Sequence, residues 1–278
     1  SSVPLWFLAQ MAAEQVTVVL SGEGADEIFG GYAWYEDNPS VAKYKRMVPF
    51  GVRRALGKAA KHMPYFKGHN FLMKGAEMAE EYFVGQALVW PEREVSSVLR
   101  PEYDKGEGAF ELAAPIYARV SDKSELIRKQ YLDMNMWLPG DILLKADKMC
   151  MAHSLELRVP FLDRRVMEFA EHIPDRYRVN ENGNKLVLRH AANKSLPDEW
   201  ATRPKVGFPV PMIYWLREEK WYNWVKEYFT APWASEFFDC DVLMGLLDEH
   251  YEGKAQNQRK IYTPLVFLIW YKRYFIDE

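Results

Sequence analysis

Cysteine is scarce in this chain, with only Cys150 and Cys240 among its 278 residues. Two cysteines cannot form a disulfide framework, and they provide no cluster of ligands for a structural metal. Cys150 stands among methionines and an alanine and is predicted to be buried, whereas Cys240 follows an aspartate and is predicted to be exposed. We expect neither thiol to be catalytic.

Long apolar runs and an excess of one charge are also missing. The longest apolar candidate, residues 265–271, is far shorter than the roughly 18 residues that a membrane-spanning helix needs. Lysine and arginine number 36 against 39 aspartates and glutamates, so the formal net charge is -3. Without a polybasic block, neither a membrane nor a nucleic acid is expected as a partner. No secretory signal opens the chain, so the cytoplasm is the expected compartment.

Strand signals are few, although 49% of the residues are apolar and 15% are aromatic, enough for a large globular core. Residues 16–20 form the one clear strand, because they are apolar and rich in β-branched side chains. A lone strand cannot satisfy its backbone, so we expect neighbouring parallel strands from a part of the protein outside this chain. Helical periodicity predicts helices at about 4–14, 48–62, 75–86, 92–99, 108–120, 123–137, 139–153, 164–172, 184–194, 210–229, 239–252 and 256–275.

The predicted strand runs directly into small residues and carboxylates, Ser21-Gly22-Glu23-Gly24-Ala25-Asp26-Glu27. Glycine lets a backbone turn tightly and approach a ligand closely. The carboxyl end of a strand is where α/β folds bind ligands, and carboxylate oxygens there suit Mg²⁺. The alternative is an acidic surface turn that opens a helix.

A helix predicted at 139–153 carries polar residues on one face. Asp141, Lys145 and Lys148 are spaced four and three apart, so they lie on the same side. The two lysines are candidates for neutralising phosphate oxygens. The alternative is a solvated stripe in which Asp141 pairs with Lys145.

Residues 154–163 alternate polar and apolar side chains, as in a half-buried strand, but Pro160 favours an extended connector. Glu156 and Arg158 point to the same side of an extended chain. Arg158 is a candidate for binding a substrate carboxylate, and the alternative is an internal ion pair with Glu156. Further along, prolines and a glycine predict a loop at 203–209, where Lys205 would ordinarily be exposed and inert.

Three of these segments together resemble the asparagine synthetase family, class B. Residues 21–32 resemble its Ser-Gly-Glu-Gly-(Ser/Ala)-Asp-Glu-x-Phe-Gly-Gly-Tyr signature. Residues 141–163 resemble its Asp-x-Leu-x-Lys-x-Asp-(Arg/Lys)-x-x-Met-Ala-x-Ser-Leu-Glu-x-Arg-x-Pro-Phe-Leu-Asp block, and Arg203-Pro204-Lys205-Val206-Gly207-Phe208 resembles a third segment. The three occur in the family's order, and the resemblance covers about residues 1–220.

The resemblance implies an α/β fold, the three-layer ATP-pyrophosphatase domain, of which this chain supplies a mainly α-helical part with one or two parallel strands. The family's Ser-Gly-Gly-x-Asp-Ser pyrophosphate loop is not found, nor is an early cysteine of a glutaminase domain. We therefore expect residues 1–278 to be the carboxyl-terminal portion of the synthase domain. It would pack on the missing amino-terminal half and be inactive alone, and family habit points to a homodimer.

The implied activity is the amidation of aspartate to asparagine through β-aspartyl-AMP, using ATP, Mg²⁺ and ammonia released from glutamine. The resemblance implies the following roles: Ser21, Gly22, Glu23 and Lys148 bind the nucleotide, Asp26 binds Mg²⁺, Arg158 binds the substrate, and Glu23, Glu156 and Lys205 are catalytic. Lys205 would stabilise the activated intermediate and the departing pyrophosphate.

Three alternatives stay open. A relative such as a β-lactam synthetase or a peptide-cyclising homologue would adenylate another carboxylate. β-lactam synthetases typically carry tyrosine where Glu23 stands, so the glutamate favours ammonia as the nucleophile. A non-catalytic scaffold and an autonomous helical interaction module are alternatives from a different class.

Overall fold

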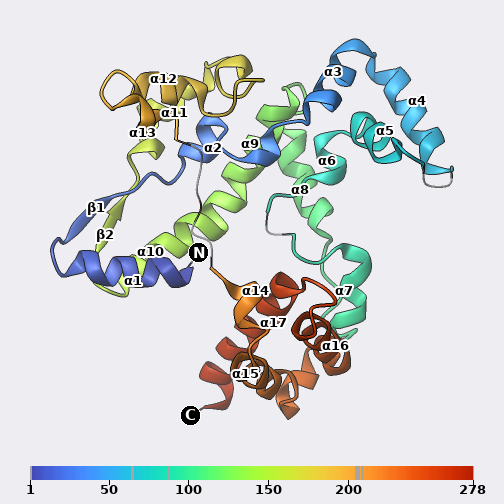
Figure 1. The fold of residues 1–278 in the computed structure, drawn as a ribbon, viewed down its shortest axis with the longest axis vertical. Coiled ribbons are helices and arrows are strands. Elements are labelled where there is room, and N and C mark those ends of the chain that lie inside the picture. Colours follow the sequence, from blue (N-terminus) through green and yellow to red (C-terminus); the bar gives the residue numbers. More distant parts are fainter. Residues whose placement is uncertain (1, 64–65, 87, 204–206, 208–209, 278) are drawn as a thin grey trace. The chain divides into compact units, whose positions relative to one another are not determined.

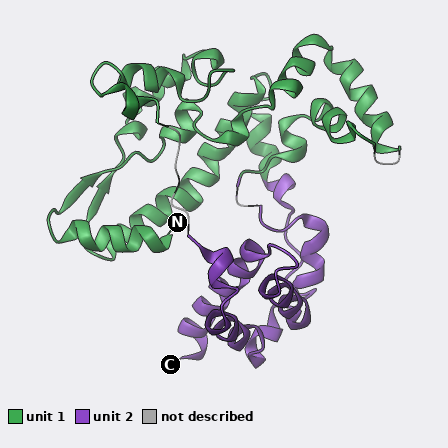
Figure 2. Ribbon diagram, in the orientation of Figure 1, with its two compact units in different colours: residues 1–85, 113–208 green, residues 86–112, 209–278 purple. Residues whose placement is uncertain are grey.

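The computed structural model describes residues 2–63, 66–86, 88–203, 207 and 210–277 (Figure 1). The chain divides into two compact units, residues 1–85 with 113–208 and residues 86–112 with 209–278 (Figure 2). Both consist mainly of helices, as the periodicity predicts. Lys205 lies outside the described residues, with most of the loop around it.

The first unit contains the only two strands that the described part of the chain forms. Its elements are α1 (Ser2–Ala13), β1 (Val18–Leu20), α2 (Ala25–Phe29), η1 (Ala33–Tyr35), α3 (Pro39–Met47), α4 (Phe50–Lys61), α5 (His69–Ala76), α6 (Ala79–Tyr82), α9 (Glu125–Asn135), η2 (Leu138–Leu143), α10 (Leu144–Met151), β2 (Glu156–Arg158), η3 (Pro160–Leu162), α11 (Arg164–Glu171), η4 (Asp175–Tyr177), α12 (Leu186–Ala192) and α13 (Asp198–Ala201).

The strands β1 and β2 pair in parallel, with Val18 opposite Glu156 and Leu20 opposite Arg158. One neighbour of β1 is therefore β2 of this chain, which confirms the one or two parallel strands expected in it, and further neighbours from outside the chain stay a prediction. The extended connector predicted at 154–163 is corrected. Pro160 follows the ladder by two residues and does not interrupt its hydrogen bonds, so Glu156–Arg158 forms a strand.

The turn from α10 into β2 explains how this pairing arises. Ser154 adopts a left-handed backbone with φ of 57°, and Leu155 N donates to Cys150 O at 3.1 Å. This geometry ends the helix and aims Glu156 N at Thr17 O, 2.9 Å away. The strand thus begins beside β1 as soon as the helix stops.

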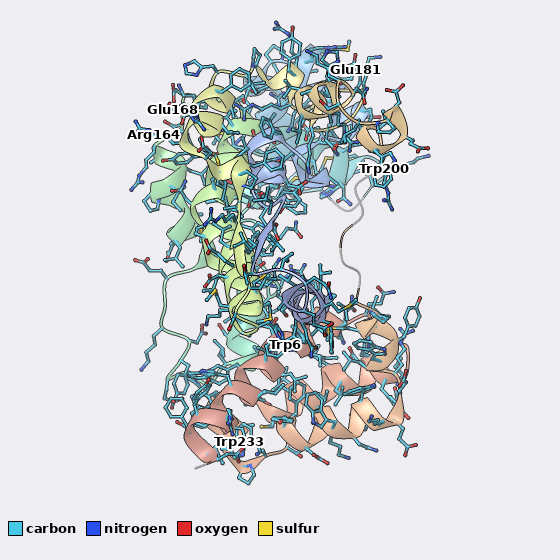
Figure 3. The ribbon with its side chains drawn as sticks, turned by 90° about the vertical axis from the view of Figure 1, so that its left-hand side faces the viewer. Trp6, Arg164, Glu168, Glu181, Trp200 and Trp233 are labelled. Carbon is cyan, nitrogen blue, oxygen red and sulfur yellow. The ribbon has the colours of Figure 1, made fainter. Side chains whose placement is uncertain are left out.

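Helices α1 and α10 pack together beside the two strands (Figure 1). A small core joins them, in which Ala9, Cys150 and Leu155 are buried against Val19 and Leu157. Trp6 of α1, which is labelled in Figure 3, stands edge-on to His153. The ring centroids are 4.5 Å apart. Cys150 is buried as predicted, at 2% exposure. A second core packs Ala25, Ile28 and Phe29 of α2 against Ala170 and Ile173.

The second unit is mainly helical in its described residues, with one isolated antiparallel bridge between Leu99 and Phe238. It contains α7 (Glu92–Val98), α14 (Met212–Trp215), α15 (Glu219–Phe229), η5 (Pro232–Glu236), α16 (Cys240–Tyr251), α17 (Gln258–Tyr271) and η6 (Lys272–Ile276), and the boundary between the units falls inside α8 (Ala109–Ala118). Its core is built around Phe229, Leu243, Leu247, Ile261 and Leu268, none of them measurably exposed. No helix in the described ranges is long and apolar enough to cross a membrane.

Two predicted helices are each broken in the structure. The helix expected at 75–86 is interrupted by Glu77, which is extended between α5 and α6. The helix expected at 210–229 is interrupted by Glu218, which is extended and precedes α15. The helix predicted at 139–153 begins earlier in the structure, because a π-helical turn, η2, which includes Pro139, lies between α9 and α10.

Candidate functional site

The loop that follows β1 is fixed beside the end of β2. Ser21 N donates to Arg158 O at 2.8 Å, which extends the ladder by one step beyond the strand. Ser21 Oγ then accepts from Glu23 N at 3.3 Å. The serine side chain thus turns the backbone away from the sheet, and the loop projects from the carboxyl end of both strands.

The two glycines of this loop are under different structural constraints. Gly24 precedes α2 with φ of 88°, and a Cβ on it would fall 2.5 Å from the side chain of Leu162. Its conformation and the packing of the chain therefore require glycine. A Cβ on Gly22 would meet nothing within 4 Å. No described atom of this chain explains Gly22, and an exposed glycine at a strand end leaves room for another molecule.

Glu23 and Lys145 connect this loop to α10. Lys145 Nζ lies 3.9 Å from Glu23 Oε1, and the lysine side chain is only 12% exposed. Among the described residues Lys145 therefore pairs with Glu23 rather than with Asp141, the partner that the sequence offered as an alternative. Lys148, the predicted nucleotide ligand one turn further along, is exposed.

Glu156 and Arg158 form an ion pair on β2, with Arg158 Nε donating to Glu156 Oε1 at 2.9 Å. Both side chains are more than half exposed, at 56% and 63%. The internal pair that the sequence left as an alternative is thus present. Exposure leaves the pair weak and open to rearrangement when a ligand arrives.

Asp26 lies in the first turn of α2 and pairs with Lys185, which directly precedes α12. Lys185 Nζ is 2.8 Å from Asp26 Oδ1. Sequence reasoning missed this lysine, because a lysine after Asn182-Gly183-Asn184 resembles any exposed turn residue. The position next to Asp26 is thus one that already accepts a cation.

Glu27 stands beside these residues in the sequence but is part of the core. Its side chain is 1% exposed, and burial raises the pKa of its carboxyl. Tyr32 donates its hydroxyl to Glu27 Oε1 at 2.5 Å. At the end of α2, Gln130 and Arg178 donate side-chain hydrogen bonds to Ile28 O. These buried contacts hold the helix that follows the loop.

The described residues bring together no group of three or more histidines, cysteines, aspartates or glutamates that could hold a metal ion. Asp26 is the carboxylate at which the metal is predicted. Mg²⁺ commonly keeps several waters and is held by one or two carboxylates plus substrate phosphates. One carboxylate that faces a cation fits an ion that arrives with a nucleotide.

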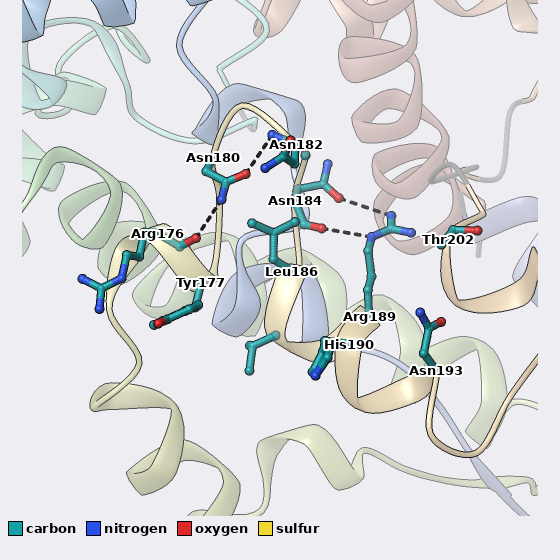
Figure 4. A pocket seen from close by; sticks show the side chains of 12 residues that line it. Arg176, Tyr177, Asn180, Asn182, Asn184, Leu186, Arg189, His190, Asn193 and Thr202 are labelled. Atoms are coloured by element: carbon teal, nitrogen blue, oxygen red, sulfur yellow. Dashed lines mark hydrogen bonds between the residues drawn. The ribbon is translucent and has the colours of Figure 1, made fainter. Parts of the chain in front are cut away.

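A cavity of about 1140 Å³ lies elsewhere, along α12 and the turn before it (Figure 4). None of the predicted site residues that the structure describes lines it. Its rim includes Asn184 and Leu186, the two neighbours of Lys185. Figure 4 shows Arg189 donating to Asn184, which secures the turn from the cavity side.

The structure therefore brings two of the three motif segments together, residues 21–26 and residues 145–158. Lys205 and most of the loop at 203–208 lie outside the described residues, so the place of the third segment at this site stays a prediction. Arg203, at the start of that loop, accepts through its carbonyl from Arg189 Nη1 at 2.9 Å. Arg189 thus ties the entry of the loop to the turn that carries Lys185.

A family model described as asparagine synthase matches residues 1–272. Asparagine synthetase [glutamine-hydrolyzing] 1 of Bacillus subtilis (strain 168) is 38% identical over 284 aligned residues, which cover 100% of this chain and 44% of the relative. A putative asparagine synthetase [glutamine-hydrolyzing] of Mycobacterium tuberculosis (strain ATCC 25618 / H37Rv) is 37% identical, covering 97% of this chain and 41% of the relative. The Homo sapiens asparagine synthetase [glutamine-hydrolyzing] is 34% identical over 57% of this chain.

The chain thus spans less than half the length of the curated relatives that match it from end to end. The matching model extends over nearly all of its residues, and it includes the loop after β1, helix α10 and strand β2. On this evidence the chain belongs to the asparagine synthase family.

Proposed function

We propose that the protein to which this chain belongs makes asparagine from aspartate, ATP and ammonia released from glutamine. The observation that carries the proposal is the convergence of two motif segments at one end of the β1–β2 pair. There Ser21 N is bonded to Arg158 O, and Glu23 lies beside Lys145. Ligands of α/β folds bind at the carboxyl ends of parallel strands.

The chemistry needs an activated acid, because a carboxylate does not react with an amine at a useful rate in water. Aspartate attacks the α-phosphate of ATP through a β-carboxylate oxygen, and pyrophosphate leaves. Ammonia then attacks the β-carbonyl carbon of β-aspartyl-AMP, and AMP leaves with the carboxylate oxygen. Both steps develop negative charge on phosphate oxygens, so fixed cations at the site are the main catalytic requirement.

Nucleotide binding is assigned to Ser21, Gly22 and Glu23, with Lys145 and Lys148 as cations. The open space over Gly22 supports this role, because nothing in the described chain explains the glycine. Lys145 is the better placed of the two lysines, since its side chain is 12% exposed and faces the loop. Lys148 is exposed and would contact phosphate from the solvent side.

Asp26 is the proposed Mg²⁺ ligand. Its place in the first turn of α2, directly after the loop that follows β1, supports the assignment. Lys185 Nζ, 2.8 Å from Oδ1, shares the same carboxylate. When bound with the nucleotide, the ion would neutralise charge on the phosphates. Asp26 would share it with a carboxylate from another part of the protein.

The remaining roles concern the reacting groups. Glu23 would handle a proton of the incoming ammonia, since its carboxylate lies on the loop after β1 and is partly exposed. Arg158 would leave Glu156 to bind the substrate α-carboxylate, and Glu156 would then face the reacting centre. Lys205 would stabilise the charge of the departing pyrophosphate, brought in by its loop when substrate is bound.

Another part of the protein, corresponding to the length of the relatives that this chain does not match, is proposed to cover β1 and α1. Three apolar side chains there support this, since Leu20, Met11 and Phe7 are 74%, 66% and 59% exposed. Residues 1–278 would then be the carboxyl-terminal portion of the synthase domain. Both cysteines are free thiols, which suits a cytoplasmic protein. A homodimer is also proposed, and sedimentation velocity of the full-length protein tests it.

Pyrophosphate release by the full-length protein tests the proposed function. With aspartate and Mg·ATP we expect release that requires aspartate, and with glutamine or ammonia added we expect asparagine and AMP. Release with a different carboxylic acid but not with aspartate would assign the protein to a relative of another specificity. No release with any carboxylate would contradict an adenylating enzyme and favour a scaffold.

A further inference from the structure

The ion pair between Asp26 and Lys185 has no role in the chemistry described so far. Lys185 Nζ lies 2.8 Å from Asp26 Oδ1, and the two side chains are only 19% and 21% exposed. Partial burial makes such a pair less screened by water than a surface pair. Its geometry is therefore specified more closely than that of the exposed Glu156–Arg158 pair.

The backbone of Lys185 is held in an unusual conformation. Its φ and ψ are 51° and 32°, which is the left-handed region, immediately before α12. A residue with a Cβ adopts this region at a cost in free energy, so it persists where the surroundings fix it. From this backbone conformation the side chain of Lys185 reaches Asp26.

Both neighbours of Lys185 are tied to other elements, which fixes this conformation. The hydrogen bonds are Asn184 Nδ2 to Glu36 Oε1 at 2.9 Å, Arg189 Nε to Asn184 O at 2.9 Å, and Leu186 N to Arg178 O at 3.2 Å. The turn that presents the lysine is thus anchored to the segment after η1, to α12 itself and to the segment after η4. It is a preformed support rather than a loose loop.

Gly31 provides the space in which the pair lies. A Cβ on Gly31 would fall 1.9 Å from Asp26 Oδ1 and 2.0 Å from Lys185 Cε, far inside contact distance. Gly31 N also donates to Asp26 O at 2.7 Å, which keeps the two residues adjacent. The chain therefore needs glycine at position 31 in order to bring these two side chains together.

We propose that Lys185 is a positioning residue that acts through Asp26, and that Gly31 leaves the space in which the two side chains meet. Lys185 holds the Asp26 carboxylate in one orientation before Mg²⁺ and nucleotide arrive. This inference rests on the proposed function, because it assigns Lys185 to the support of the proposed Mg²⁺ ligand. Partners of a ligating carboxylate act in this way on metal affinity.

The test measures ATP binding to the full-length protein by calorimetry at a series of Mg²⁺ concentrations, without aspartate. Lys185→Met keeps the length of the side chain and removes its charge, and Gly31→Ala keeps both charges and separates them. We expect each variant to raise the Mg²⁺ concentration at half-maximal ATP affinity by about 10-fold or more. Excess Mg²⁺ should restore the affinity, which loss of folding could not do.

Three controls complete the design. Arg164→Met removes the exposed Arg164–Glu168 pair on α11 (Figure 3) and should leave the Mg²⁺ midpoint unchanged. Gly51→Ala adds a methyl group in α4 where a Cβ meets nothing within 4 Å, and it too should have no effect. Asp26→Asn should also raise the Mg²⁺ midpoint, and adding Lys185→Met to it should change nothing more.

The possible failures are distinguishable. If the wild-type protein binds ATP without any dependence on Mg²⁺, the proposed function loses its metal site and the inference is overturned with it. If wild-type binding depends on Mg²⁺ but Lys185→Met keeps the wild-type midpoint, the role of Lys185 is wrong and the proposed function stands. An additional loss from Lys185→Met in the Asp26→Asn background would also overturn the inference, because it would show that Lys185 acts independently of Asp26.

Discussion

Lys145 Nζ lies 3.9 Å from Glu23 Oε1 and joins the loop after β1 to helix α10. These side chains come from two segments far apart in the sequence, and each belongs to a separate motif of the family. Because they meet at the end of β1, the two motifs form one site. The proposed adenylyl transfer also requires a cation beside the nucleotide loop, because negative charge develops on the phosphate oxygens.

Lys145→Met should slow aspartate-dependent pyrophosphate release by about 10²-fold or more, because a preorganised cation at developing phosphate charge is removed. Lys148→Met is the matched control on the same helix. It should lose less activity, since its exposed ammonium is screened by solvent. Steady-state assays of the two variants would contradict the assignment if Lys148→Met were the more impaired.

Gly22→Ala and Gly24→Ala should separate ligand binding from stability. In Gly24→Ala the left-handed backbone and the contact with Leu162 are both disturbed, so the free energy of unfolding should fall by about 1–3 kcal/mol. In Gly22→Ala the added methyl group meets nothing in the described chain, so unfolding should be unchanged while ATP affinity falls. Denaturant titration and calorimetry on both variants provide the comparison, and normal ATP binding by Gly22→Ala would refute the role of Gly22.

Lys205→Ala should cost about 10²-fold or more in adenylation, as for other groups that stabilise transition-state charge. The reduction should appear in kcat rather than in the KM for ATP, because the lysine is expected to act on the departing pyrophosphate. Rapid-quench measurement of pyrophosphate formation checks this. Near-normal formation would remove Lys205 from the mechanism.

Asp133 should make the stability of the first unit depend on pH. Its side chain is 1% exposed and accepts from Tyr35 Oη at 2.6 Å. Burial raises the pKa of its carboxyl from 3.8 to about 6. Between these two pH values the folded protein keeps a proton that the unfolded chain has released. The contribution of Asp133 to the free energy of unfolding is therefore largest below about pH 4 and declines as the pH rises toward 6.

Asp133→Asn should remove that decline, which amounts to about 3 kcal/mol for a shift of this size. The amide oxygen still accepts from Tyr35, so folding should be retained. Unfolding free energies of wild type and variant across pH 4 to 7 check the difference. The exposed Asp122→Asn should preserve the wild-type dependence, and an unchanged slope in Asp133→Asn would refute the assignment.

Motifs identified much of this site, but not which side chains face each other. The spacing of Lys145 and Lys148 placed both on one helix face, yet only tertiary packing decides that Lys145 is 12% exposed and directed at Glu23. Glu156 and Arg158 were placed on the same side of an extended chain, and the structure confirms their ion pair. Buried Cys150 was likewise predictable, because an apolar neighbourhood on a helix marks the core.

Lys185 could not be found in this way. Its role depends on a left-handed backbone, on hydrogen bonds from Asn184 and on a glycine at position 31, none of which produces a periodic pattern. Strand β2 is hard to predict for another reason, because Pro160 favours a connector and the polar–apolar alternation before it favours a strand. The proline lies beyond the ladder and costs no hydrogen bond.

The most direct test of the account follows the oxygen of the substrate carboxylate. The full-length protein is given aspartate labelled with ¹⁸O in its β-carboxylate, together with Mg·ATP and glutamine, and AMP and asparagine are analysed by mass spectrometry. If the loop after β1 activates aspartate as an adenylate, AMP carries one labelled oxygen for each asparagine formed. Formation of ADP with the label in inorganic phosphate, or unlabelled AMP, would contradict the central claim.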